Sequence, residues 1–462
     1  SSKNAYRELT IICTTNMFTS FFFIARILGN ILTEGVSYIF IHKKYNQFVK
    51  GVTHSLVKTD VLFVKIIQSL AHSNNLIDDE INNELVRYTD RVPFTKMDLN
   101  SDIIDHIKRE TPYVFVNDVP FRSGMISLIY QIEHRDTHKR YILKVKRNNI
   151  KARLNKSIET MSAFLSMLSS IIYWWGKIDI QEPIDRHMNV LEEQLDFQQE
   201  KENTKLFYRN FEYIDYVRVP EIIEDDNLFN NDYIIMEYIE GISFDNVDPK
   251  VYDKYASLVT KMALNCIIIN GTIHGDLHAG NLIFIENNDN IPEHEKIPKY
   301  QIGVIDLGLV VTVPTKIQEL THFAIMNFQK QDKLIQIAER YLRATLYPPD
   351  FLDTLSEKDR HYIIQNATDL LANTLKEGNT ISQIKVYNSF QTVNTYIQNV
   401  IAQDYKVKLD KYVVSMQVAI SMSNGVTLQL SNNDLNLQLK NAADEMFHVN
   451  LFEDISESDE DE

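Results

Sequence analysis

Two acidic residues and one amide have the types and spacing that phosphoryl transfer requires. Asp276 and Asn281 are five residues apart, and Asp306 follows further along the chain, directly before a Leu-Gly pair. Phosphoryl transfer needs a carboxylate that orients the acceptor and takes up its proton, and it needs oxygen ligands for magnesium. Asp276 is the candidate for the first role, and Asn281 and Asp306 are the candidates for the second.

Apolar segments flank these polar residues and are expected to position them. One apolar lead-in runs from Asn265 to Ile273, and a second runs from Tyr300 to Ile305. Between them, residues 282–285 are predicted to form a short buried strand, because this apolar run is bounded by polar residues. Strands that end at such loops can hold the two acids and the amide close together.

Two other interpretations of this segment are open. Isolated Asp and Asn residues commonly form turns, and a single Asp would be interpreted that way. The ordered set with its flanking strands favours phosphoryl transfer instead. The second alternative is a metal site built on His274 and His278. Such a site would need both on one helical face, and Gly275 next to Asp276 disfavours a helix there.

Bulk properties restrict the class of protein. A chain of 462 residues is long enough for two lobes, each with its own core, and the net charge of -16 argues against nucleic-acid binding. Seven of the last ten residues are acidic, so residues 451–462 are predicted to form a disordered tail. With only Cys13 and Cys266, a disulfide framework is not expected, which indicates a reducing, intracellular compartment.

Residues 1–110 are expected to be mainly helical. The apolar stretch from Leu9 to Ala25 is interrupted by Thr, Asn and Ser, and it is too short and too polar for a confident transmembrane helix. Apolar residues on one helical face here predict core packing, with a membrane surface as the alternative. The residues of this face are Met17, Phe21, Ile24 and Leu28.

The pattern changes to strands after Thr111. Three β-rich runs cover residues 113–116, 126–130 and 141–145. Lys144 lies inside the third run, and a Lys in an apolar strand needs an anionic partner to offset its desolvation. In a kinase-like lobe, a Lys at this position has two anionic partners, a helix Glu and the nucleotide phosphate. Glu200, on a helix predicted over residues 191–203, is the candidate for the helix Glu. The alternative is an edge-strand Lys that points to solvent.

The remaining segments are predicted from their periodicity. An apolar helical insertion is expected over residues 150–180. Residues 234–241 are predicted to form a strand that leads into a hinge between two lobes, with Glu237 as a candidate nucleotide contact. Helical periodicity continues after Gly308 as far as Phe447.

The order of these motifs resembles the UbiB family of atypical protein-kinase-like proteins, roughly from residue 60 to residue 320. Segments 274–281 and 306–308 match the catalytic and metal motifs of that family, and segment 141–144 matches its Val-Ala-Val-Lys strand. Lys65-Ile66-Ile67-Gln68 is similar to its Lys-x-Gly-Gln signature. Gln194-Leu195-Asp196, followed by Glu200, is similar to its Glu-x-Asp segment and helix Glu.

The resemblance implies an α+β, bilobal protein-kinase-like fold. Residues 1–110 would form a helical N-terminal extension, 111–240 an N-lobe with a helical insertion, and 241–450 a helix-rich C-lobe. It implies a Mg²⁺-dependent ATPase or phosphotransferase that binds ATP or ADP, with a link to lipid or quinone metabolism. A lipid or membrane surface is a further implied partner, and the phosphate acceptor is left open.

The resemblance also implies roles for individual residues. The nucleotide would contact Lys144, Glu237 and the loop residues Ser123, Gly124 and Met125. The N-terminal extension would cover the cleft where a protein substrate enters, and it would carry the regulatory residues. These are Lys65, Gln68, Gln194 and Asp196.

This sequence departs from the family pattern at three places. Gln194 replaces an acid, which leaves Asp196 as the charged partner of Lys65, and Ile67 replaces a Gly. The loop at residues 122–125 has no Ala, which bears on nucleotide preference. Two other functions stay open: a small-molecule phosphotransferase of the aminoglycoside or choline kinase type, and a non-catalytic nucleotide-binding regulator. Retention of all three phosphotransfer residues argues against the regulator.

Overall fold

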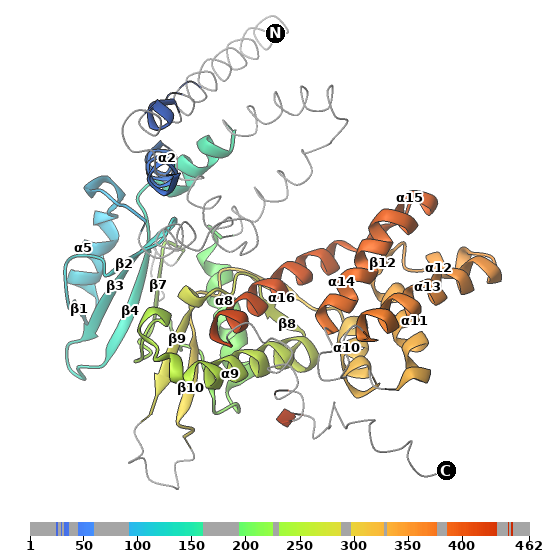
Figure 1. Ribbon diagram of the computed structural model, residues 1–462. Coiled ribbons are helices and arrows are strands. Elements are labelled where there is room, and N and C mark those ends of the chain that lie inside the picture. Colours follow the sequence, from blue (N-terminus) through green and yellow to red (C-terminus); the bar gives the residue numbers. More distant parts are fainter. Residues whose placement is uncertain are drawn as a thin grey trace, which may run out of the picture. The chain divides into compact units, whose positions relative to one another are not determined.

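The computed structural model describes residues 25, 29, 32–36, 45–59, 92–159, 194–224, 231–287, 297–327, 330–376, 386–431, 442, 445 and 446. The chain divides into two compact units (Figure 1). The first unit comprises residues 1–205 and 220–238, and the second comprises residues 206–219 and 239–462. Lys65, Gln68, the predicted insertion beyond residue 159 and the acidic tail lie outside the described residues.

An antiparallel sheet of six strands forms the centre of the first unit. Its order is β1-β3-β4-β7-β6, with β2 paired to β3. The strands are β1 (Tyr113–Phe115), β2 (Arg122–Ser123), β3 (Ser127–His134), β4 (Arg140–Lys146), β6 (Ile222–Ile223) and β7 (Tyr233–Glu237). The three β-rich runs expected after Thr111 are thereby confirmed. Because β4 lies between β3 and β7, Lys144 is on a central strand and not on an edge.

Helices of the first unit pack on this sheet or precede it. Helix α5 (Ser101–Glu110) buries Ile103 and Ile107 in the same core cluster as the inward side chains of β3 and β4. Residues 150–159 are helical, as expected for the start of the predicted insertion. Further described elements that precede the sheet in sequence include α2 (Tyr45–Thr59) and the short 3-10 helix η2 (Lys96–Asp98).

Helix α8 (Phe197–Phe211) begins later than the predicted helix and extends further. Asp196 explains where it begins. Its carboxylate accepts hydrogen bonds from the backbone N–H groups of Gln198 (3.0 Å) and Gln199 (3.2 Å). A side chain that satisfies the first free N–H groups of a helix acts as its N-cap.

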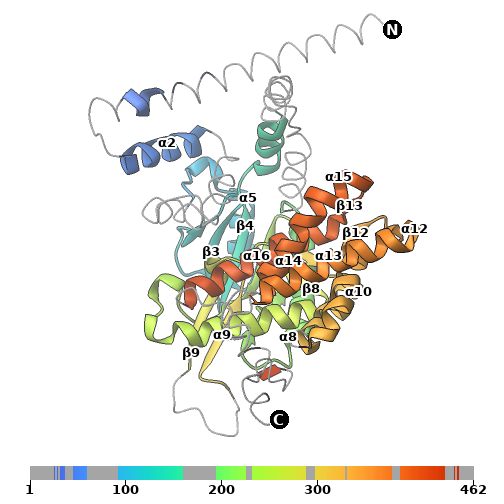
Figure 2. The same cartoon turned by 45° about the vertical axis from the view of Figure 1, so that its right-hand side comes forward.

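The described part of the second unit is rich in helices and contains three small sheets. Its principal helices are α9 (Tyr252–Leu264), α10 (Thr315–Asn327), α11 (Leu334–Thr345), α12 (Phe351–Thr354), α13 (Glu357–Lys376), α14 (Val386–Tyr396), α15 (Ala402–Tyr405) and α16 (Lys411–Leu430), which can be followed in Figure 2. Two π-helical segments, η5 (Asn265–Asn270) and η10 (Ile397–Ile401), extend α9 and α14. Short 3-10 turns are η3 (Phe244–Asn246), η4 (Pro249–Val251), η6 (Ala279–Asn281) and η8 (Gln331–Lys333).

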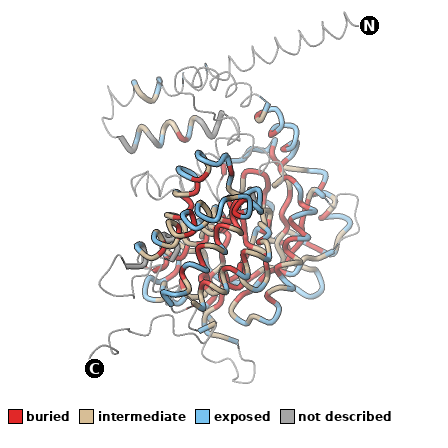
Figure 3. Tube along the Cα trace, turned by 90° about the vertical axis from the view of Figure 1, so that its right-hand side faces the viewer, coloured by how far each residue is buried: buried red, intermediate tan, exposed pale blue. Residues whose placement is uncertain are grey.

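Strands of the second unit pair across long stretches of sequence. They are β5 (Val217–Arg218), β8 (Thr272–His274), β9 (Leu282–Glu286), β10 (Tyr300–Val304), β11 (Val310–Thr312), β12 (Leu346–Tyr347) and β13 (Lys408–Leu409). The pairings are β5-β10-β9, β8-β11 and β12-β13. One large apolar cluster fills the interior, and Figure 3 shows how buried residues concentrate there. In the part of the chain that the structure describes, no helix has the length and apolar character needed to span a bilayer.

The apolar lead-in from Asn265 to Ile273 is helical over most of its length. Residues 265–270 form the π-helical segment, and only the short strand β8 follows. Gly271 ends the helix with a left-handed backbone, φ 65°, a conformation that glycine adopts without a Cβ penalty. The sequence identifies this segment only as an apolar lead-in, and periodicity alone does not distinguish a short buried helix from a buried strand.

Candidate active site

The register of β9 and β10 brings Asn281 next to the segment that leads to Asp306. Leu282, the first residue of β9, pairs with Val304, the last residue of β10. The backbone N–H of Ile305 donates to the carbonyl oxygen of Asn281 at 3.0 Å. Asn281 and Asp306 therefore lie at the same end of this strand pair.

The pair β8 and β11 brings Asp276 to the same place. His274 pairs with Val310, and the N–H of Gly275 donates to the carbonyl of Leu309 at 2.8 Å. Asp276 comes shortly after β8, and Asp306 comes shortly before β11. Because β8 and β11 are paired, the two acids lie at the same end of this pair. A Cβ on Gly275 would lie 2.6 Å from Cγ of Leu309, so glycine is the residue that permits this close approach.

A side-chain contact links two of the three polar residues. The Nδ2 of Asn281, which is buried, donates to the backbone carbonyl of Asp276 at 3.0 Å. This contact uses the Nδ2 of the amide and sets its orientation. The Oδ1 is the atom of this side chain that could bind a cation. Asp306 is exposed and has φ 67°, an uncommon conformation for a residue other than glycine. Such a conformation costs free energy and is typical of functional sites.

His274 is buried beneath this loop and orients it. Its Nδ1 accepts a hydrogen bond from the N–H of Asp276 at 3.1 Å. Burial lowers the pKa of His274 to about 4, although the carboxylates of Asp276 and Asp306 oppose the shift. The imidazole is therefore neutral at pH 7, with its proton on Nε2. Sequence reasoning missed this positioning role, because a buried histidine cannot be distinguished from an exposed one by spacing alone.

The alternative metal site on the two histidines does not match their contacts. The Nδ1 of His278 accepts from the N–H of Gly280 at 3.1 Å, just as the Nδ1 of His274 accepts from Asp276. The Nδ1 atoms of both histidines therefore accept hydrogen bonds from the backbone. Residues 274–278 are not helical, so the two side chains do not share a helical face. Over the described ranges of the chain, no three His, Cys, Asp or Glu side chains come together as a metal site.

In the first unit, the structure contains the expected ion pair between Lys144 and Glu200. The Nζ of Lys144 lies 2.6 Å from Oε1 of Glu200, and the two side chains are only 9% and 2% exposed. Glu200 is in the first turn of α8, behind the buried Phe197, whose ring centre is 5.5 Å from the Lys144 Nζ. Phosphate positioning by this pair stays a prediction.

The other predicted nucleotide contacts are in the same unit. Ser123 is buried in β2, and its hydroxyl donates to the carbonyl of Val92 at 2.6 Å. The N–H of Gly124 donates to the carbonyl of Ser127 at 2.9 Å, and the Met125 side chain is buried. Glu237, at the end of β7, is partly exposed.

Of the predicted regulatory residues, the described ones lie at the start of α8. Gln194 is partly exposed in the turn before the helix, and Asp196 is the N-cap described above. Their predicted partner in the N-terminal extension lies outside the described residues, so the regulatory roles stay predictions.

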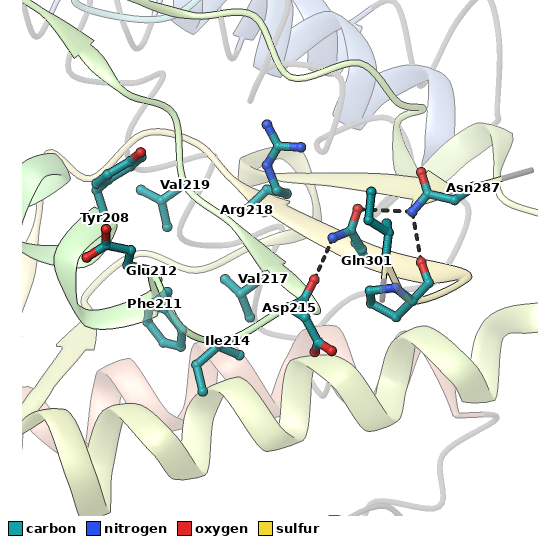
Figure 4. Close-up of a pocket in the computed structure, with 12 residues that line it drawn as sticks. Tyr208, Phe211, Glu212, Ile214, Asp215, Val217, Arg218, Val219, Asn287 and Gln301 are labelled. Atoms are coloured by element: carbon teal, nitrogen blue, oxygen red, sulfur yellow. Dashed lines mark hydrogen bonds between the residues drawn. The ribbon is translucent and has the colours of Figure 1, made fainter. Parts of the chain in front are cut away.

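A cavity of about 370 Å³ lies elsewhere in the second unit (Figure 4). Its walls include Phe211, Val217 and the two amides Asn287 and Gln301, which are hydrogen-bonded to each other at 3.0 Å. These amides belong to the ends of β9 and β10 that are remote from Asn281 and Asp306. None of the phosphotransfer residues lines the cavity.

Comparison with known families shows that the class of protein is kinase-like. The family model of the ABC1 atypical kinase-like domain matches residues 88–339, more than half of the chain. The chain belongs to the ABC1 atypical kinase-like family, which includes UbiB. This confirms the resemblance inferred from the motifs, and with it the α+β kinase-like fold.

Relatives in this family are distant. The probable protein kinase UbiB of Shewanella woodyi is 23% identical over 324 residues, which cover 68% of this chain and 57% of that protein. The probable protein kinase UbiB of Xylella fastidiosa is 25% identical over 296 residues, covering 62% of this chain and 52% of that protein. The chain thus spans a little over half the length of these two relatives.

Two solved structures that the comparison matched share little sequence identity with this chain. Rv3197 of Mycobacterium tuberculosis, solved with erythromycin, has a TM-score of 0.46 at 15% identity, covering 82% of this chain and 90% of that chain. The Rio2 kinase of Chaetomium thermophilum, in an ADP/Mg²⁺-phosphoaspartate complex, has a TM-score of 0.25 at 13% identity, covering 78% of this chain and 94% of that chain.

Proposed function

We propose that this chain binds an adenine nucleotide with Mg²⁺ and acts as an atypical kinase-like ATPase or phosphotransferase of the UbiB type. The observation that carries the proposal is the convergence of Asp276, Asn281 and Asp306, through two separate strand pairs, at one end of β9 and β10. Membership of the family supports the further proposal that the reaction serves lipid or quinone metabolism.

Asp276 is the proposed general base. It is partly exposed, so an acceptor can reach its carboxylate, while the contacts of its backbone with His274 and Asn281 fix the main chain. A carboxylate held in this way can orient an acceptor hydroxyl or water and take up its proton as the phosphoryl group is transferred.

The residues present fit a magnesium ion bound together with nucleotide phosphates. Mg²⁺ is typically held by one or two carboxylates plus substrate phosphates, and hard oxygen atoms are its ligands. The exposed carboxylate of Asp306 and the Oδ1 of Asn281 are oxygens of this kind. When bound, the ion neutralises charge that develops on the phosphates.

Lys144 and Glu200 are proposed to position the nucleotide phosphates. The buried ammonium is held by Glu200, so its location is set before a nucleotide arrives. A preorganised cation loses little free energy to reorganisation when an anion binds. The loop residues Ser123 to Met125 and the hinge residue Glu237 are the proposed contacts for the rest of the nucleotide.

A thermal shift experiment tests this proposal. A ligand at 100 times its Kd stabilises a protein by about 2.7 kcal/mol, so ATP with Mg²⁺ should raise the melting temperature of the parent protein. Asp306→Asn should lose the magnesium-dependent part of that shift. Asp276→Asn should keep the shift and lose ATP hydrolysis, measured with and without liposomes.

Asp253→Asn is the matched control, because Asp253 is an exposed Asp on α9 of the same unit. It should keep both the shift and the hydrolysis. A full magnesium-dependent shift in Asp306→Asn would refute the assignment of that residue as a metal ligand. Full turnover in Asp276→Asn would refute the assignment of the base.

A further inference from the structure

A buried arginine directly after β4 contacts the predicted nucleotide loop. The Arg147 side chain is 4% exposed. Its Nε and Nη2 both donate to the carbonyl of Gly124, at 3.1 Å and 2.8 Å. Its Nη1 donates to the carbonyl of Pro93 at 3.1 Å, and Nη2 also donates to that of Val92 at 3.3 Å. One guanidinium thus connects the loop to residues 92–93.

Asp98 supplies the counter-charge for this arginine inside the first unit. Its Oδ1 lies 3.4 Å from Nη1 of Arg147 and 2.6 Å from Nη1 of Arg153. Its Oδ2 accepts from the N–H and the hydroxyl of Thr95. Burial by itself would raise the pKa of Asp98, but these hydrogen bonds and the charge of Arg147 outweigh it and hold the pKa below its ordinary value.

The loop is also held directly by the segment that Arg147 contacts. The N–H of Val92 donates to the carbonyl of Ser123 at 2.9 Å, and the Ser123 hydroxyl donates back to the carbonyl of Val92. The N–H of Arg147 donates to the carbonyl of Ile126 at 2.8 Å. The turn between β2 and β3 is therefore fixed by backbone on one side and by the guanidinium on the other.

We infer that Arg147 is a positioning residue that fixes the backbone of the nucleotide loop at Gly124, with the segment of residues 92–98 as its support. The inference rests on the proposed function, in which this loop contacts the nucleotide. A loop that is held in its binding conformation loses less conformational entropy when a ligand binds. The loop supported by Arg147 therefore binds nucleotide more tightly than a loosened loop would.

Only an arginine satisfies this set of acceptors. The planar guanidinium has five N–H donors in a fixed arrangement, whereas a lysine has one ammonium that acts as a point charge. Arg147→Lys keeps the charge opposite Asp98 but cannot serve the carbonyls of Gly124, Val92 and Pro93 together. The substitution therefore separates loop positioning from charge neutralisation.

Arg153→Lys is the matched control. Arg153 binds the same carboxylate oxygen of Asp98, its side chain is 48% exposed, and among the described residues its contacts do not include the loop. Both variants are measured in two ways. Hydrogen exchange over residues 122–127 is followed in the nucleotide-free protein, and the Kd for ATP with Mg²⁺ is then determined.

Arg147→Lys should lose protection in the loop and bind nucleotide about tenfold more weakly, which corresponds to about 1.4 kcal/mol. Arg153→Lys should match the parent in both measurements. Equal loop exchange in the two variants would overturn the inference, and so would a loosened loop with an unchanged Kd. A parent protein that binds no nucleotide would instead refute the proposed function, while the exchange measurement would still decide whether Arg147 holds the loop.

Discussion

The buried pair of Lys144 and Glu200 gives the most quantitative prediction. Two unit charges 2.6 Å apart attract each other by about 6 kcal/mol at an effective dielectric constant of about 20. Substitution of one partner removes this contact from the other, buried side chain, and breaking a buried pair typically costs about 3–5 kcal/mol. Glu200→Gln and Lys144→Met should each lower the free energy of unfolding by an amount near this range.

The double variant should lose less than the sum of the single variants, because the contact between the two side chains can be lost only once. We expect a coupling free energy of at least about 1.5 kcal/mol, the lower end for close charge pairs. The assay is urea unfolding followed by circular dichroism for the parent, the two single variants and the double variant. Nucleotide affinity measured on the same proteins then tests whether the pair also positions phosphate.

Lys108 and Asp118 provide a control pair in the same unit. Their charged atoms are also 2.6 Å apart, but the side chains are 42% and 76% exposed. Exposed pairs contribute only about 0–1 kcal/mol, so the same cycle on this pair should give a small coupling. A coupling below about 0.5 kcal/mol for Lys144 and Glu200 would be ordinary additivity and would refute the reasoning.

Two further predictions concern the second unit. Gly275→Ala should lower the free energy of unfolding by about 1–3 kcal/mol, because the new Cβ would clash with Leu309. Gly425→Ala is the control and should not lower it, because nothing lies within 4 Å of the added Cβ. Equal effects of the two substitutions in urea unfolding would contradict the close approach of β8 and β11. Burial raises the pKa of the Cys266 thiol to about 12, so iodoacetamide at pH 8 should leave it unmodified in the native protein and modify it after denaturation, as peptide mapping would report. Rapid native labelling of Cys266 would show that this part of the core opens.

The sequence by itself determined the kinase-like class and much of the local structure. A carboxylate and an amide five residues apart, with a second carboxylate before Leu-Gly, led to the prediction of phosphoryl transfer, since this reaction needs such a set in this order. The apolar runs at residues 141–145 and 282–285 predicted strands β4 and β9 because their side-chain patterns are local properties of the chain. Lys144 in such a run also required an acid, as the cost of burying a lone charge dictates.

Tertiary structure decided how these parts meet. Glu200 was predicted as the partner of Lys144, but the two residues are 56 positions apart, and it is the packing of α8 beside Lys144 that brings them into contact. The left-handed backbone of Asp306 and the neutral state of His274 arise from strand register and burial, which no local pattern encodes. Arg147 was missed for the same reason: a charged residue just after a strand resembles a solvated one until distant carbonyls surround it. The backbone of Asp306, the state of His274 and the contacts of Arg147 all depend on residues far apart in the sequence, so they follow only from the folded structure.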